Sequence, residues 1–192
     1  MKSCRIRLVA VWVAAGWTFL PGPVQAALWW HNAPAPARLG FLAHWESSAI
    51  NGRFPVFRCL LETTSSDQPQ ALKVVIRTAS LRFRSPLLER PARSAVWFDV
   101  KAFPQAVFSS HEIQPLGPGQ YHAAGVLVLK GVRHEVSVRF HLTSPRPGFL
   151  LMTGTGQVRR QVFGIGNGVW QKSSMVGSRV VIHFRVGFVP GP

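Results

Sequence analysis

The chain has 192 residues, of which 47% are hydrophobic and 15% charged. Such a length suits one domain plus a targeting segment, and such a composition can bury a sizeable core, which excludes a wholly disordered chain. The 17 Gly and 15 Pro are interspersed and leave no sustained apolar heptad run, which excludes a coiled coil. The net charge of +15 attracts nucleic acid, anionic lipid or phosphate without selecting among them.

Residues 1–26 have the pattern of a secretory signal peptide. Lys2, Arg5 and Arg7 precede an apolar run over residues 8–20, and small residues up to Ala26 follow a Pro-Gly-Pro break. The alternative is an uncleaved membrane anchor, but the apolar run is short for a span of roughly 20 residues. We therefore expect cleavage after about Ala26 and a periplasmic protein, for which a nucleic-acid partner is not expected.

Removal of this segment changes the cysteine count and the charge. Cys4 is lost and Cys59 remains alone, so no disulfide within the chain is expected. The mature chain keeps 19 Lys+Arg against 7 Asp+Glu, a net charge of +12.

Alternating apolar and polar residues, separated by Gly/Pro-rich turns, predict strands over most of the remaining chain. Residues 27–37 are rich in Pro and Ala and are expected to be a flexible lead-in, followed by a domain over residues 38–190. The expected strands are residues 39–46, 54–62, 72–78, 105–113, 120–130, 134–142, 149–160 and 179–188.

One connection is longer than the others. Residues 80–104, between the third and fourth strands, contain 86–90 and 93–98, which indicate short helical turns. Eight strands with short links predict a mainly all-β fold, an eight-stranded antiparallel barrel with a short helical segment. An interior of this size is either filled by side chains or holds one small ligand. A packed core or a two-layer sandwich is the alternative to a cavity.

Five ordered motifs span most of the mature chain. They are Gly-Arg-Phe-Pro-Val-Phe at 52–57, a Trp-Phe-Asp and Phe-Pro-x-x-x-Phe-x-Ser run within 97–110, Gly-x-Leu-x-Leu-Lys-Gly-Val at 125–132, Arg-x-x-Phe-Gly-Ile at 160–165 and Val-Gly-x-x-Val at 176–180. In their order and spacing these motifs resemble the YceI-like family of exported lipid-binding proteins.

The resemblance implies a lipocalin-like barrel around an apolar pore that holds a long isoprenoid chain. It implies a non-enzymatic carrier, with no cofactor other than a bound isoprenoid lipid or quinone. Val162 and Ser178 stand where the family motifs are acidic, and Arg133 stands where they have Thr. These three departures make the chain more basic than the family pattern.

Two sets of residues are candidate contacts for such a ligand. The glycine-rich residues 164–168, with basic neighbours, could accommodate an anionic head group or contact an anionic membrane. The head-group candidates are Arg159, Arg160 and Lys172. The candidates for the apolar chain are Trp45, Cys59, Ile76, Phe108, Leu127, Leu129, Val138, Phe140, Met152, Phe163, Trp170 and Phe184.

Other chemistry has little support in the sequence. The seven His are scattered without the spacing of a zinc site, and no Gly-x-Ser-x-Gly elbow or paired carboxylates are visible. Cys59 alternates with Phe57 and Leu61 on one strand face, which indicates a buried thiol and leaves a thiol-dependent enzyme as a weaker alternative. An eight-stranded outer-membrane barrel is the other alternative.

Overall fold

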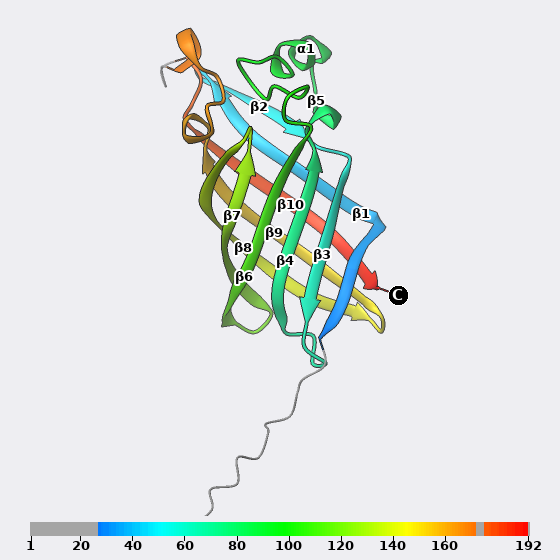
Figure 1. Ribbon diagram of the computed structural model, residues 1–192. Coiled ribbons are helices and arrows are strands. Elements are labelled where there is room, and N and C mark those ends of the chain that lie inside the picture. Colours follow the sequence, from blue (N-terminus) through cyan, green and yellow to red (C-terminus); the bar gives the residue numbers. More distant parts are fainter. Residues whose placement is uncertain (1–26, 172–174, 192) are drawn as a thin grey trace, which may run out of the picture.

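A computed structural model describes residues 27–171 and 175–191 of the chain. The expected signal peptide lies outside these residues. Figure 1 labels the main elements along the chain. In order they are β1 (Leu28–Trp45), β2 (Ser48–Arg53), β3 (Phe57–Thr63), β4 (Pro69–Arg77), η1 (Thr78–Ser80), β5 (Arg82–Phe83), η2 (Pro86–Leu88), α1 (Glu89–Ala92), β6 (Gln105–Gly117), β7 (Gln120–Leu129), β8 (Val132–Arg146), β9 (Phe149–Arg159), η3 (Arg160–Phe163), η4 (Gly168–Gln171) and β10 (Arg179–Pro190).

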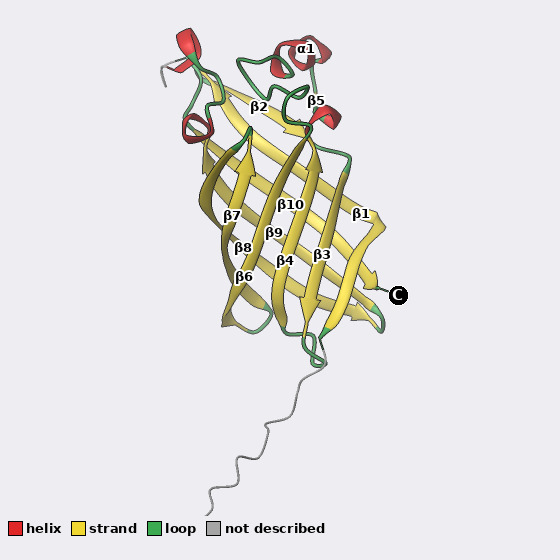
Figure 2. Ribbon diagram, viewed as in Figure 1, coloured by secondary structure: helices red, strands yellow, loops and turns green. Residues whose placement is uncertain are grey.

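Eight antiparallel strands form a closed barrel, as the sequence predicts. The order is β10-β9-β8-β7-β6-β4-β3-β1, and β1 pairs with β10 to close it. Strands make up the wall of the barrel (Figure 2). Each strand turns one set of alternate residues inward. On β4, for example, Leu72, Val74 and Ile76 face the interior, while Lys73 and Arg77 are exposed. The alternation of apolar and polar residues in the sequence therefore produces an apolar barrel interior and a charged exterior.

The first strand is longer than expected. Residues 28–37, expected to be a flexible lead-in, belong to β1: Leu28 to His31 pair with β3, and Trp30 to Asn32 pair with β10. Pro and Ala are tolerated here because the register of β1 against β10 is interrupted between Asn32 and Ala37, where ladder hydrogen bonds are not needed. The far half of β1 also pairs with β2, which in turn pairs with β5.

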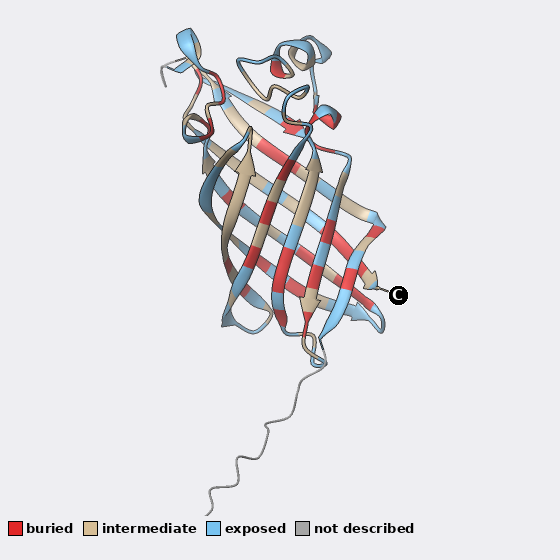
Figure 3. Cartoon of the chain, in the orientation of Figure 1, coloured by how far each residue is buried: buried red, intermediate tan, exposed pale blue. Residues whose placement is uncertain are grey.

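Large side chains fill one end of the barrel. Leu61, Leu150 and Phe188 are almost inaccessible to solvent, and the rings of Tyr121 and Phe140 stack with centroids 5.4 Å apart. Figure 3 shows buried residues alternating with exposed ones along the strands. We call this the closed end of the barrel.

The opposite end carries two irregular segments, residues 84–104 and 160–171, which we call the cap (Figure 1). The helical turn expected at 86–90 is present as η2 and α1. Residues 93–98 form turns and a bend instead of the expected helix, because Asp99 adopts a left-handed conformation and its N–H bonds back to Ser94. Within the described residues, no helix has the length and apolar character needed to cross a membrane.

Candidate ligand-binding cavity

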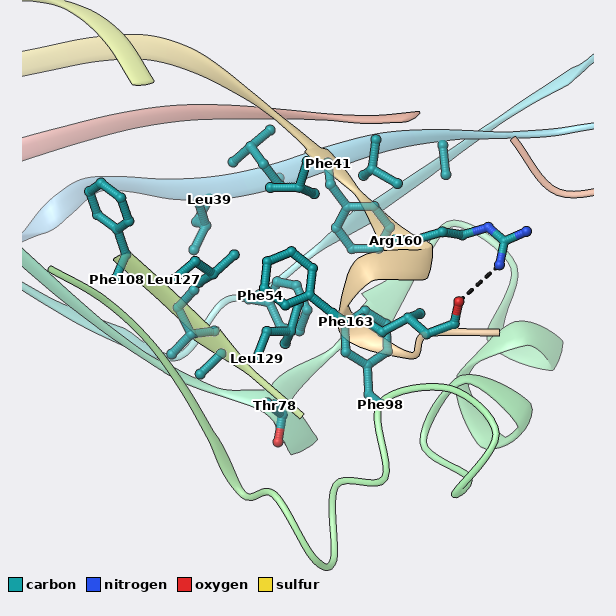
Figure 4. A pocket seen from close by; sticks show the side chains of 18 of the residues that line it. Leu39, Phe41, Phe54, Thr78, Phe98, Phe108, Leu127, Leu129, Arg160 and Phe163 are labelled. Atoms are coloured by element: carbon teal, nitrogen blue, oxygen red, sulfur yellow. Dashed lines mark hydrogen bonds between the residues drawn. The ribbon is translucent and has the colours of Figure 1, made fainter. Parts of the chain in front are cut away.

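A cavity of about 410 Å³ lies inside the barrel, between the filled closed end and the cap. This volume is within the usual range for small-molecule sites. Inward-facing residues of the strands form its wall, including Leu39 and Phe41 from β1 and Leu127 and Leu129 from β7 (Figure 4). Met152 belongs to both the cavity lining and the core of the closed end, so it forms part of the floor.

The cap supplies the roof. Leu88 and Phe98 approach from the first segment of the cap, and Phe163 and Trp170 from the second. The Trp170 ring lies 5.0 Å from that of Trp45, measured between centroids. A ligand therefore meets side chains from distant parts of the sequence, which only the closed fold brings together.

The lining is almost entirely apolar. Among the described residues that form it there is no Asp, Glu, Lys or His. The Thr78 hydroxyl donates a hydrogen bond of 2.7 Å to the Phe103 carbonyl, so it is already paired. A buried polar group of a ligand would find almost no partner here, and the lining therefore favours an apolar chain over a polar molecule.

Cys59 lies in the wall near the floor. Its thiol is buried, and this burial raises its pKa far above the usual value for cysteine. The thiolate, which is the nucleophilic form, is therefore disfavoured. Cys59 thus serves as a small apolar residue of the wall, and its burial opposes formation of the reactive thiolate.

Among the lining residues that the structure describes, Arg160 is the one that carries a charge, and this charge holds the backbone around it. Its side chain is 3% exposed, and its guanidinium donates five hydrogen bonds of 2.5–3.1 Å to carbonyl oxygens. These oxygens belong to Ile165, Gly166, Trp170, Val176 and Gly177. Burial lowers the pKa of Arg160, but a guanidinium remains protonated in proteins. All five N–H groups are occupied, so none is left for a ligand head group.

The glycine-rich residues 164–168 form a tight turn around this guanidinium. Gly166 has a φ of +72°, and a Cβ there would lie 2.6 Å from Nη1 of Arg160, so only glycine fits. The backbone N–H groups of Gly166 and Asn167 both point to the Val96 carbonyl. The anion cradle considered from the sequence is therefore not formed by these two N–H groups.

Lys130 joins the two segments of the cap. Its ammonium donates to the carbonyls of Gly164 at 2.8 Å and Val96 at 3.4 Å. Desolvation lowers the pKa of Lys130, and the nearby Asp99 carboxylate partly opposes this shift. Lys130 follows β7 directly, so this contact fastens the cap to the barrel.

The structure brings together eleven of the twelve residues suggested for the apolar chain. Phe140 is the exception: it faces inward but lies deeper, stacked on Tyr121 in the core of the closed end. Alternation shows that Phe140 points inward, but it does not show how far along the barrel axis the cavity extends. Of the head-group candidates, Arg159 is exposed outside the lining, Arg160 is occupied as above, and Lys172 lies outside the described residues.

Several lining residues were not singled out from the sequence. Val180 and Ile182 share the inward face of β10 with Phe184, so alternation could have identified them. Trp97 and Phe98 lie in an irregular segment without periodicity, and no sequence signal placed them over the cavity. The described residues also contain no cluster of three or more His, Cys, Asp or Glu that could hold a metal ion.

A model of the YceI-like domain matches residues 30–188, which include the cap and all of the barrel except the outermost residues of β1 and β10. The chain belongs to the YceI-like family. This is a family of binding proteins that is not known for enzymes. A search of curated proteins found no match.

Solved structures show the same fold. BcnA from Burkholderia cenocepacia is 24% identical, with a TM-score of 0.76, and the match covers 81% of this chain and 98% of that chain. A polyisoprenoid-binding domain from Saccharophagus degradans, implicated in plant cell wall breakdown, is 13% identical with a TM-score of 0.67, covering 86% and 100%. The YceI protein of Campylobacter jejuni is 14% identical with a TM-score of 0.69, covering 78% and 89%.

Proposed function

We propose that this protein is an exported, non-enzymatic carrier that sequesters a long apolar lipid of the polyisoprenoid type, including the tail of a quinone. The observation that carries the proposal is the apolar cavity inside the barrel, in whose lining the hydroxyl of Thr78 and the guanidinium of Arg160 are already hydrogen-bonded. The polyisoprenoid-binding domain of the same fold supports this ligand class. Export, expected from residues 1–26, gives the carrier a periplasmic location.

Affinity for such a ligand comes from surface area. Each Å² of apolar surface removed from water contributes about 25 cal/mol, before the costs of association are subtracted. The barrel wall is held by backbone pairing around its circumference, so the cavity exists before the ligand arrives. A preformed apolar cavity therefore binds without any catalytic group.

Purification from the native host tests the proposal directly. Organic extraction and native mass spectrometry are expected to find a bound isoprenoid lipid, and the delipidated protein is expected to bind added polyprenyl lipids. Absence of a bound lipid, together with failure of the delipidated protein to bind any of them, would contradict the proposal.

A substitution in the wall shows whether the lipid occupies this cavity. Leu127 of β7 faces the cavity, whereas its neighbour Val126 lies outside the lining. Leu127→Trp should fill the space and lower affinity for a polyprenyl lipid at least about tenfold, since more than about 1.4 kcal/mol of burial is displaced. Val126→Trp is the matched control and should bind as the wild type does. Equal loss in both variants would place the ligand elsewhere.

Two other functions fit less well. A transmembrane barrel needs apolar residues outward, but here Lys73, Arg139 and Arg185 lie on exposed strand faces. A thiol enzyme would need an activated Cys59, whose pKa is instead raised by burial. Cys59→Ser distinguishes this case, because unchanged lipid binding in that variant leaves the enzyme hypothesis without a nucleophile.

A further inference from the structure

We propose that the cap end of the barrel docks on an anionic lipid bilayer, with apolar tips inserted between the head groups and a ring of cations around them. This docking rests on the proposed function, because it gives the apolar ligand a source, the bilayer, and a surface through which to enter, the cap.

The cap exposes apolar side chains at its tips. Leu87, in η2, is 85% exposed, and Val169, in η4, is 70% exposed. Val96 and Val162 are exposed as well, and all four belong to the cap segments at one end of the barrel (Figure 1). An exposed leucine is common by itself, but four apolar tips at one end can enter a bilayer together.

Cations gather at the same end of the barrel. The exposed basic residues of the cap and its adjacent strand ends include Arg84, Arg90, Lys101, Arg133, Arg159 and Arg179. The acids near them are few: Glu89 is paired with Arg82 and Arg93, Asp99 lies beside Lys130, and Glu46 and Glu135 are exposed. A net positive surface around apolar tips complements an anionic bilayer.

The closed end lacks this combination. Leu116 is 56% exposed in the β6–β7 hairpin, and Trp29 is exposed near the start of β1. Near them, the basic residue Arg146 is accompanied by the acidic residues Glu62, which pairs with Trp29 across the strands, Asp67 and Glu112. Apolar exposure alone therefore occurs at both ends, and the positive ring selects the cap end.

The cavity lies directly under the proposed docking surface. The closed end is filled by buried side chains, so the shorter way between the cavity and the exterior passes the cap. Docking by the cap would place that route against the apolar interior of the bilayer. An apolar chain could then move between membrane and cavity with little exposure to water, which is the costly step in its transfer.

Vesicle sedimentation with the purified protein tests the docking surface. The vesicles contain phosphatidylglycerol and phosphatidylcholine, or phosphatidylcholine alone, at low and high salt, and no isoprenoid is added. The wild type should sediment with the anionic vesicles at low salt, and high salt should weaken this. Leu87→Asp and Val169→Asp should each bind about tenfold more weakly, since each removes an inserted side chain and adds a repelled charge.

Matched variants at the closed end serve as controls. Leu116→Asp and Arg146→Glu should bind as the wild type does, whereas Arg90→Glu should weaken the salt-sensitive part of the binding, because it reverses one of several cap cations. Melting temperatures should change little, because all these side chains are exposed, and Arg146→Glu loses only an exposed contact with the Phe149 ring. As a second measurement, brominated phosphatidylglycerol should quench the tryptophan fluorescence of wild type and Trp29→Phe alike, since Trp29 lies at the closed end.

Three results would overturn the proposal: no binding to anionic vesicles, equal binding to both kinds of vesicle, or losses in the closed-end variants as large as in the cap variants. Binding of polyprenyl lipid delivered from cyclodextrin is measured separately and should survive Leu87→Asp. Docking without lipid binding would therefore reject the proposed function alone, and lipid binding without docking would reject this inference alone.

Discussion

The guanidinium of Arg160 makes a charged residue part of an apolar wall. It gathers five carbonyl oxygens from residues 165–177 and so holds the second cap segment in one conformation over the cavity. The planar fork of arginine suits this arrangement, and a lysine ammonium could not reach five acceptors in these directions. The charge thus organises a loop that has little regular secondary structure.

Arg160→Lys is therefore expected to cost about 3 kcal/mol of unfolding free energy, because at least two buried carbonyls lose their donor. Urea unfolding measures this loss. The exposed neighbour Arg159 is the control, and Arg159→Lys should change stability by less than about 0.5 kcal/mol. Similar effects in both variants would contradict the structural role given to Arg160.

The buried thiol of Cys59 predicts a pH dependence of stability. Its pKa is raised from 9.0 by burial, so the folded protein keeps the proton above pH 9 while the unfolded chain loses it. The stability that comes from this protonation is complete below pH 9 and falls as pH rises, by about 1.4 kcal/mol per unit. Unfolding measured from pH 8 to 10, relative to Cys59→Ala, should show this decline; parallel curves would contradict it.

At the scale of elements, the cap depends on a few contacts between two segments far apart in the sequence. The Val96 carbonyl accepts from Gly166 and from Lys130, and the Trp97 and Trp170 rings lie 6.0 Å apart. These contacts are few compared with the continuous pairing of the strands. The cap is therefore the part of the fold expected to open first.

Lys130→Met is expected to loosen the cap without unfolding the barrel, because it removes the donor shared by the Val96 and Gly164 carbonyls. Hydrogen exchange should accelerate in residues 93–104 and 160–171 and remain unchanged in β3 and β4. A bound apolar ligand should also dissociate faster. Uniform acceleration over all strands would show a general loss of stability instead.

The strands were predictable from the sequence because alternating apolar and polar residues mark one buried and one solvent-exposed face. The same alternation placed Val138 on the inward face, whereas residues 120–130 are apolar on both faces, so alternation alone did not decide that Leu127 and Leu129 face the cavity. Alternation failed for Phe140, because it shows that a side chain points inward but not how far along the barrel axis it lies. It also failed for Trp97 and Phe98, because they lie in an irregular segment without alternating faces. The glycine-rich residues 164–168 with their basic neighbours suggested that the Arg160 charge binds a ligand, since no sequence pattern shows that distant backbone carbonyls surround it. Residues 28–37 were missed because Pro and Ala hid an interrupted strand.

At the scale of the whole molecule, the barrel contains a cavity that packing does not fill. Unoccupied apolar space forfeits contacts that a ligand can restore. A bound lipid therefore stabilises the folded state by an amount set by its concentration relative to Kd, about 2.7 kcal/mol at one hundred times Kd.

Delipidation should accordingly lower the melting temperature, and added polyprenyl lipid should restore it. Calorimetry of the two forms measures the shift. In Leu127→Trp, whose side chain occupies part of the cavity, the same lipid concentration should stabilise the protein by about 1.4 kcal/mol or less, because binding is at least about tenfold weaker. A full stabilisation of that variant would show that the effect arises outside the cavity.

The pairing of β1 with β10 has a consequence for how the protein folds. These two strands stand at opposite ends of the described chain, with Trp30 opposite Pro190, so the barrel closes through the most distant partners in the sequence. Such long-range closure is entropically costly and slow, and it leaves the edge of β1 unpaired until β10 arrives. A folding intermediate in which β10 has not yet paired with β1 has no closed barrel and therefore no cavity. The final strand thus completes the fold and creates the binding site in the same step.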